Sequence, residues 1–344
     1  MNTKHRILFK TAQNMNEIAP ESVDLVVTSP PYPMIEMWDE IFANQNPKIR
    51  EALEKKDGNL AFSLMHLELD KIWMEISRIL TPGGIVCINI GDTTRTIAKR
   101  FQLYPSHSKI IECFMNLGFQ SLPEILWRKQ TNAPNKFMGS GMLPPGAYVT
   151  LEHEYILIFR KGNKKEFKSD SEKQNRRESA YFWEERNVWF SDIWDFKGIS
   201  QGINNSKTRE RSAAYPFELA YRLINMFSVK GDIILDPFLG TGTTMLAAIA
   251  SERNSIGFEI DEKFREIIQD TINSSASHIN EYIENRIEKH RSFIADRVEK
   301  KGPTKYMNDY YNFPVITRQE IMLIIRKIQN INVFQPAEFE IEYL

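Results

Sequence analysis

The sequence predicts an α/β fold, in which a mainly parallel β-sheet carries helices on both faces. Three short β-prone runs predict it, at residues 23–27, 233–235 and 256–259. Two of them lead directly into residues that break a strand. Runs this apolar are typical of strands buried on both faces in the middle of a parallel sheet.

The other elements of the predicted core follow in chain order. Residues 7–9 predict a short first strand. Apolar residues between 65 and 80 recur at helical spacing until Pro-Gly-Gly at 82–84 ends the helix. The remaining predictions are a strand over 85–90, a helix over 110–117, β runs over 122–127 and 155–159, and a helix over 218–227.

Residues 236–244, DPFLGTGTT, predict a tight turn between a strand and a helix. Asp236-Pro237 ends the strand, and Gly240 and Gly242 permit a sharp turn. Thr243 and Thr244 are candidate N-cap residues for the helix that follows. Such a turn brings backbone N–H groups close to a ligand at the carboxyl edge of the sheet. The alternative is a turn that only packs the helix on the strand.

The spacing in this turn limits the ligand. It does not fit GxGxxG, because Ala247 falls outside that spacing, and it does not fit GxxxxGK[ST], because no lysine follows. An adenosyl ligand without phosphates is therefore favoured over a dinucleotide or a nucleotide phosphate. Glu259, at the end of the next strand, has the position of an acid that holds the two hydroxyls of a ribose.

Residues 28–33, TSPPYP, follow the run at 23–27. Pro30 and Pro31 cannot continue a sheet ladder, so the chain leaves the strand in a stiff, extended form. Ser29 and the Pro30 carbonyl can both accept hydrogen bonds from the exocyclic amine of a nucleobase, which favours a more nucleophilic nitrogen. Tyr32 offers a face on which an extruded base can stack, since the amine cannot be reached inside a duplex.

These two motifs resemble those of the S-adenosylmethionine-dependent DNA amino-methyltransferases, which act on cytosine N4 or adenine N6. SPPY matches the family's catalytic motif, and DPFLGTGTT with GFEID matches its cofactor motif. SPPY comes 207 residues before the cofactor motif, which is the order of the β class. The resemblance covers most of residues 5–265. It implies a Rossmann-like methyltransferase sheet, S-adenosylmethionine as cofactor, and direct attack on the sulfonium methyl without a covalent enzyme intermediate.

The resemblance also implies which residues form the site. The catalytic residues would be Ser29, Pro30, Pro31 and Tyr32. The cofactor-binding residues would be Asp236, Pro237, Phe238, Gly240 and Gly242 around the methionyl part, Thr243 and Thr244 at its carboxylate, Glu259 at the ribose, and Pro216 in the covering segment. One departure stands out. Many members carry Gly-Asp after the first strand, with the Asp at the adenine amine, whereas Lys10-Thr11 stand near that place here.

Within the family, serine before Pro-Pro-Tyr goes mostly with cytosine N4, and aspartate or asparagine with adenine N6. Ser29 therefore predicts site-specific methylation of cytosine N4 in double-stranded DNA by base flipping, as part of a restriction-modification system. Adenine N6 is the nearest alternative, since a hydroxyl can accept from an amine of either ring. An RNA or protein amine methyltransferase is a further one. A catalytically silent DNA-binding module is disfavoured by the intact SPPY and GTG. Cys87 and Cys113 lie in apolar runs, so neither is a candidate for the cysteine nucleophile of carbon-5 methylation.

Composition sets the broader expectations. The chain has 344 residues, of which 42% are hydrophobic and 26% charged, as in an ordinary soluble globular protein. No apolar run approaches the ~18 residues of a membrane span, and the first residues lack the pattern of a signal peptide. Two cysteines suit a reduced compartment, and six histidines show no metal-ligand spacing. We expect a cytoplasmic protein with no metal and no membrane contact.

Charge and aromatic residues indicate where DNA would bind. Residues 128–177 carry 11 Lys or Arg against 5 acids, a balance of +6 in a chain of net charge −1. Residues 162–211 combine charge with many aromatics, which suits DNA contact, although a small packed subdomain would use the same aromatics.

The predicted organisation has four parts. They are a catalytic half (1–161), a recognition region (162–211), a cofactor half (212–273) and a helical C-terminal extension (274–344). The extension would hold one amphipathic helix after residue 275 and a second one from Thr317, where Glu320 completes a capping box. A homodimer and a companion restriction endonuclease for the same site are further expected partners.

Overall fold

The computed structural model describes residues 2–129, 138–197, 215–335 and 337–344. Ten of its strands form one sheet, in the order β10-β6-β9-β3-β2-β11-β12-β1-β16-β15. In chain order these strands are β1 (Asn2–Leu8), β2 (Val23–Thr28), β3 (Leu80–Ile90), β6 (Phe119–Arg128), β9 (His153–Lys161), β10 (Ile193–Asp195), β11 (Ile233–Asp236), β12 (Asn254–Phe258), β15 (Ile328–Gln335) and β16 (Glu338–Tyr343).

The middle of the sheet is parallel, as the apolar runs predict. Strands β3, β2, β11, β12 and β1 all run in the same direction. Strands β2 and β11 are far apart in sequence yet pair directly, with Leu25 opposite Ile234 and Val26 opposite Leu235. Their carboxyl ends therefore lie at the same edge of the sheet.

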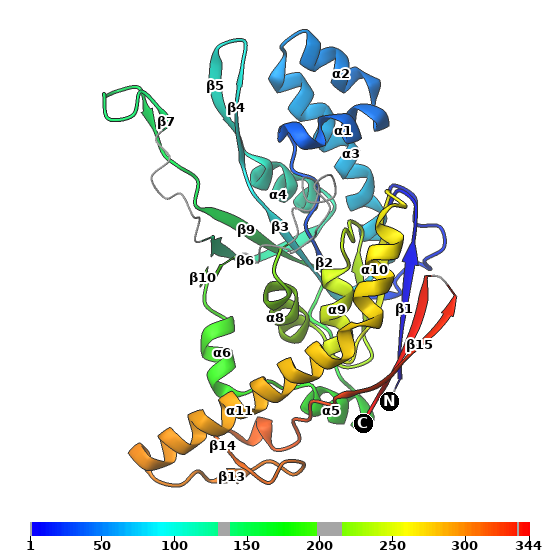
Figure 1. Ribbon diagram of the computed structural model, residues 1–344, viewed down its shortest axis with the longest axis vertical. Helices are drawn as coiled ribbons and strands as arrows, with labels where there is room; N and C mark the ends of the chain where they lie inside the picture. Colours follow the sequence, from blue (N-terminus) through cyan, green and yellow to red (C-terminus); the bar gives the residue numbers. More distant parts are fainter. Residues whose placement is uncertain (1, 130–137, 198–214, 336) are drawn as a thin grey trace.

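Helices cover both faces of the sheet, so the predicted Rossmann-like fold is confirmed (Figure 1). One face carries α1 (Asp39–Gln45), α2 (Pro47–Glu54), α3 (Gly58–Ile79) and α4 (Ser106–Asn116), with the short η1 (Glu36–Trp38) before them. The other face carries α8 (Phe217–Phe227), α9 (Thr243–Ala250), α10 (Phe264–Asn273) and α11 (Ser275–Lys301). Successive residues of β3 alternate between the two cores: Ile85 and Cys87 enter one, Val86 and Ile88 the other.

In the described part of the chain, three small hairpin-like pairs lie outside the main sheet. They are β4 (Thr93–Ile97) with β5 (Arg100–Tyr104), β7 (Met138–Gly139) with β8 (Ala147–Tyr148), and β13 (Tyr306–Met307) with β14 (Pro314–Val315). The first two project from the same end of the sheet as α1 and α2 (Figure 1). Sequence periodicity did not reveal them, because each strand has five residues or fewer.

The described part of the expected recognition region packs on the core. Helices α5 (Asp170–Glu178) and α6 (Trp183–Trp189) lead to β10, which extends the sheet beside β6. Phe182, Trp189 and Trp194 are buried, as in the alternative of a packed subdomain. Residues 198–211 of that region lie outside the described residues. A role in DNA recognition for residues 162–197 stays a prediction.

The second C-terminal helix is a wrong prediction. The capping box forms, with Glu320 accepting from Thr317 N at 2.7 Å, but only η2 (Arg318–Glu320) follows. The carbonyl oxygens that would continue a helix are bonded elsewhere. Asn308 Nδ2 donates to the oxygens of Glu320 and Leu323, at 2.9 and 2.8 Å, and Lys230 Nζ donates to that of Ile324 at 2.6 Å.

Beyond η2 the chain returns to the sheet. Strand β16 pairs antiparallel with β1, and β15 pairs with β16. Phe339, Ile341 and Tyr343 are buried while the residues between them are partly exposed. The alternating EFEIEY of β16 carried this signal. The described part of the C-terminal extension therefore holds one long helix, α11, the short pair β13–β14, η2 and the hairpin β15–β16, in place of two helices.

Candidate active site

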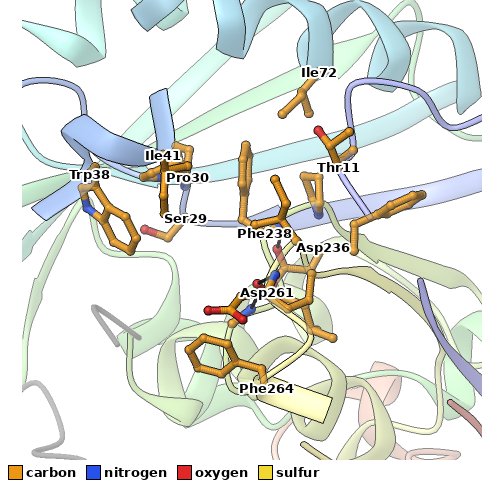
Figure 2. A pocket seen from close by; sticks show the side chains of 18 of the residues that line it. Thr11, Ser29, Pro30, Trp38, Ile41, Ile72, Asp236, Phe238, Asp261 and Phe264 are labelled. Carbon is orange, nitrogen blue, oxygen red and sulfur yellow. Dashed lines mark hydrogen bonds between the residues drawn. The ribbon is translucent and has the colours of Figure 1, made fainter. Parts of the chain in front are cut away.

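A pocket lies at the carboxyl edge of the sheet, where β2, β11, β12 and β1 end (Figure 2). It is lined by Lys10, Thr11, Ala12, Ser29, Pro30, Pro31, Tyr32, Trp38, Ile41, Gln45, Ile72, Tyr215, Asp236, Pro237, Phe238, Leu239, Gly240, Thr241, Thr243, Phe258, Glu259, Ile260, Asp261 and Phe264. All four predicted catalytic residues and six of the nine predicted cofactor residues are in this set. Thr244, Gly242 and Pro216 are not.

The Ser-Pro-Pro-Tyr segment forms one wall of the pocket. Ser29 Oγ donates to Tyr32 Oη at 3.3 Å, so the serine and the tyrosine are linked. Tyr32 Oη donates to Glu154 Oε2 at 2.9 Å and accepts from Asn89 Nδ2, also at 2.9 Å. Burial, together with the charge of Glu154, raises the pKa of Tyr32 well above its usual value. The phenol therefore keeps its proton at neutral pH. Sequence reasoning missed Asn89 and Glu154, which lie far from the motif in the chain.

Asp236 ties the two halves of the site together. Its Oδ1 accepts from Thr28 Oγ1 at 2.6 Å and from Phe238 N at 3.0 Å. Its Oδ2 accepts from Tyr215 Oη at 3.3 Å and from Thr244 Oγ1. Burial raises the pKa of the Asp236 carboxyl above its usual value, while these hydrogen bonds act in the opposite direction. The residue thus borders the pocket while its carboxylate is bonded within the protein.

The helix after the turn begins differently from the prediction. Gly242, with φ of +89°, is the N-cap residue of α9, in place of Thr243 or Thr244. Thr243 lines the pocket. The Thr244 side chain is 1% exposed and bonds to Asp236 and Tyr215, so it does not face a ligand. Gly242 has no side chain with which to cap α9, and the N–H groups at a helix start suit a carboxylate.

Glu259 links the turn to the end of β12. Its Oε2 accepts from Gly240 N and its Oε1 from Asp261 N, both at 2.8 Å. Burial raises the pKa of this carboxyl to about 7. Each oxygen has a second lone pair, so the carboxylate can still accept from the hydroxyls of a ribose.

Lys10 and Thr11, which stand near the place of the expected Gly-Asp, line the pocket. Lys10 Nζ pairs with Glu17, at 2.6 and 2.7 Å to its two oxygens, and this pair is partly exposed. Thr11 lines the pocket, and so does Gln45, whose Oε1 lies 3.4 Å from Gln13 Nε2. Thr11 and Gln45 therefore contribute a hydroxyl and an amide to the pocket lining.

Trp38, Ile41 and Gln45 lie on one face of the segment η1–α1 and line the pocket along its length. Figure 2 shows Trp38 and Ile41 beside Ser29 and Pro30, with Phe238 between this group and Thr11. This segment follows the catalytic motif directly in the chain.

Tyr215, the neighbour of Pro216, lines the pocket, while a covering role for Pro216 stays a prediction. Tyr215 is 7% exposed, lines the pocket and contacts Asp236 and Thr244, whereas Pro216 is the N-cap residue of α8. Among the described residues, no group of three His, Cys, Asp or Glu could hold a metal ion. Over the same residues, no helix is long and apolar enough to cross a membrane.

Comparison with known proteins places this geometry in context. The model of a family described as DNA methylase matches residues 23–270. The Type II methyltransferase M.MthZI of Methanothermobacter thermautotrophicus is 55% identical over 342 residues, 99% of this chain and 93% of that protein. M.MjaI of Methanocaldococcus jannaschii, also a Type II methyltransferase, is 53% identical over 281 residues, 78% of this chain and 91% of that protein.

Solved structures share the fold. A candidate DNA modification methylase from Thermus thermophilus, solved in complex with S-adenosyl-L-methionine, superposes with a TM-score of 0.60 at 31% identity, over 77% of this chain and 92% of that one. The cytosine-N4-specific PvuII DNA methyltransferase superposes with a TM-score of 0.53 at 16% identity, over 79% of this chain and 93% of that one.

Proposed function

The chain belongs to the N6/N4 family of S-adenosylmethionine-dependent DNA amino-methyltransferases, and on that premise we propose that it methylates the exocyclic N4 of cytosine in double-stranded DNA. The observation that carries the choice of base is Ser29 in the first position of the catalytic motif. In this family serine goes mostly with cytosine N4. Ser29 also lines the pocket beside Pro30 and Tyr32, where an extruded base would enter.

The pocket residues fit S-adenosylmethionine. The uncapped start of α9 suits the carboxylate of its methionyl part, and Glu259 retains lone pairs for ribose hydroxyls. Thr11 and Gln45 would meet the adenine. The bound cofactor supplies an electrophilic methyl group on a sulfonium. Neither Asp236 nor Thr244 needs to touch it, because their side chains connect β2, β11 and α9.

The residues of the chain have three tasks in this reaction. Ser29 Oγ and the Pro30 carbonyl accept hydrogen bonds from the amine, which localises its lone pair on nitrogen. Tyr32 stacks against the extruded base. The Thr28–Asp236 hydrogen bond fixes the catalytic segment relative to the cofactor turn, so the two reactants meet in line.

A restriction-modification role is part of the proposal. It rests on the Type II methyltransferases M.MthZI and M.MjaI, of which the first matches 99% of this chain. A companion endonuclease that cuts the same unmethylated site, and a homodimer in solution, remain predictions.

The test is methyl transfer from labelled S-adenosylmethionine to duplex DNA, with product nucleosides resolved by mass. We expect N4-methylcytosine from the wild-type protein and, with Ser29→Ala, a rate at least about 100-fold lower, as for loss of one preorganised polar contact. Cofactor binding should be retained in that variant. N6-methyladenine as the product would overturn the choice of base and keep the family reaction. No product on DNA, with cofactor bound, would overturn the proposal.

A further inference from the structure

A buried carboxylate stands directly behind the catalytic segment and outside the pocket lining. Glu154, the second residue of β9, is 9% exposed. Its Oε2 accepts from Tyr32 Oη at 2.9 Å and from Asn89 Nδ2 at 2.6 Å, and Lys129 Nζ pairs with its Oε1. A buried charge needs such partners. Tyr32 and Asn89 thus hold the Glu154 carboxylate beside the catalytic segment.

The role proposed for Ser29 contains a directional requirement. A serine hydroxyl is both a donor and an acceptor, and its hydrogen rotates to suit its neighbours. If the hydrogen pointed at the target amine, two donors would face each other. Ser29 can accept from the amine only when its own hydrogen is directed elsewhere.

The hydrogen-bond chain behind Ser29 has one direction. An ionised carboxylate can only accept, and an amide NH₂ can only donate. Tyr32 Oη therefore donates to Glu154 and accepts from Asn89, at 2.9 Å in both cases. This leaves Tyr32 Oη as an acceptor for the Ser29 hydroxyl, 3.3 Å away. Reversing the Asn89 amide would place its oxygen against the carboxylate, so that orientation is fixed as well.

Packing keeps these hydrogen-bonded side chains in place. Gly91 lies against the tyrosine ring, where a Cβ would come within 2.9 Å of Tyr32 Cε2 and 3.3 Å of Glu154 Cγ. Burial and the charge of Glu154 raise the pKa of Tyr32, so the middle donor does not ionise at neutral pH. The ring of Tyr32 is thus constrained by packing and its hydroxyl by hydrogen bonds.

We propose that Glu154 is a positioning residue of methyl transfer: through Tyr32, its carboxylate directs the Ser29 hydroxyl hydrogen away from the target amine, so that a lone pair of Oγ faces the nitrogen. This inference rests on the proposed function of Ser29. It extends that function to a residue on a different strand, 122 residues further along the chain than Tyr32.

The decisive variant is Glu154→Gln, which keeps the shape of the side chain and replaces the obligate acceptor with a group that can also donate. We expect the single-turnover rate of methyl transfer to fall about 10- to 100-fold, the effect of a small misorientation at the reacting centre. The dissociation constants for S-adenosylmethionine and DNA should stay close to those of the wild type. Glu124→Gln on β6 is the matched control, because Glu124 is exposed and its substitution should leave the rate unchanged.

A double-mutant cycle separates positioning from simple stabilisation. Tyr32→Phe keeps the ring and removes the middle link, so it should slow transfer about as much as Glu154→Gln does. In the Tyr32→Phe background, Glu154→Gln should change the rate by less than about 3-fold, since its effect passes through the missing hydroxyl. A purely structural role would give full, additive losses and would overturn the inference.

The remaining outcomes are also decisive. A wild-type protein that transfers no methyl group to DNA refutes the proposed function itself. A wild-type protein that is active, with a Glu154→Gln variant equally fast, refutes only the inference. If Glu154→Gln does not fold, Tyr32→Phe decides: a slowed rate with intact cofactor binding supports the inference, and an unchanged rate overturns it.

Discussion

At the scale of single residues, the site divides its acids between two tasks. The Asp236 carboxylate accepts hydrogen bonds from Thr28, Phe238 N, Tyr215 and Thr244. Its task is therefore to connect these parts of the protein to one another. Among the described residues, Glu259 receives hydrogen bonds from two backbone N–H groups and borders the pocket, so it keeps capacity for a ligand. The sequence identified both positions but not this division, because hydrogen bonds between distant strands leave no local pattern.

Glu259 makes stability depend on pH. Its pKa of about 7 in the folded protein is above the usual value of 4.5, so the folded state binds the proton more tightly than the unfolded state. The resulting stabilisation is fully present below pH 4.5 and is lost as pH rises to about 7. Relative to Glu259→Gln, the cofactor-free wild type should lose roughly 1–3 kcal/mol of unfolding free energy over this range. Urea unfolding of both proteins at several pH values measures it, and parallel pH profiles would contradict the assignment.

At the scale of elements, the turn before α9 depends on a residue without a side chain. Gly242 has φ of +89°, and a Cβ there would lie 3.2 Å from Ile268 Cγ2. We expect Gly242→Ala to cost about 1–2 kcal/mol of backbone strain, with a further packing cost. It should also weaken S-adenosylmethionine binding, because the first N–H groups of α9 move.

Gly118→Ala is the matched control for that change. Gly118 has a similar φ of +83°, but a Cβ there meets nothing within 4 Å. In urea unfolding, Gly118→Ala should show the backbone cost alone. In cofactor titration, its affinity for S-adenosylmethionine should be unchanged. Equal loss of affinity in both variants would mean that general destabilisation explains the effect.

The segment η1–α1 contributes an aromatic wall near the catalytic residues. Trp38 lines the pocket beside Ser29, so we expect Trp38→Ala to lower kcat/KM for DNA about tenfold, the typical value of one aromatic contact with a base. Cofactor affinity, measured by titration, should change less than about twofold. Met37→Ala is the control, because Met37 is 37% exposed and outside the pocket lining. Loss of cofactor binding in step with methyl transfer would place Trp38 at the cofactor instead.

Elements with a strong local pattern could be predicted, and those decided by distant partners could not. The buried strands β2, β3, β11 and β12 and the stripe of α3 follow from apolar spacing alone. The capping box at Thr317 is correct locally, yet no helix forms, because Asn308 and Lys230 bind the carbonyl oxygens that a helix needs. The catalytic and cofactor motifs were predicted together, whereas Asn89, Glu154 and Tyr215 are recognised only once the strands are assembled.

At the scale of the whole molecule, the C-terminal hairpin is part of the central sheet. Ile341 of β16 is fully buried against the core beside β1. Ile341→Ala should therefore cost about 2–5 kcal/mol of unfolding free energy. The matched change Val333→Ala, on the exposed strand β15, should cost less than about 0.5 kcal/mol. A single unfolding transition that shifts only for Ile341→Ala supports this, and a separate early transition of the hairpin contradicts it.

Buried charge also joins this C-terminal segment to the cofactor half. Glu252 pairs with Lys230 and with Arg326, and the side chains of Glu252 and Lys230 are each 3% exposed. Burial lowers the pKa of Lys230 to about 8, and the charge of Glu252 opposes that shift. The segment that follows η2 is thus fixed to the loop before β11 and to the end of α9.

The interleaving of the central strands determines when the chain can fold during synthesis. β1 precedes the other described strands in the chain, yet its neighbours are β12 and β16, with His5 opposite Ser255 and Asn2 opposite Glu342. β2 can pair with β3 early, but its other edge must wait for β11. β1 therefore stays unpaired at least until β12 has been synthesised, and pairing over such separations is slow. Unpaired apolar strands invite aggregation, so production of this protein should depend on translation rate and on chaperones more than its final stability suggests.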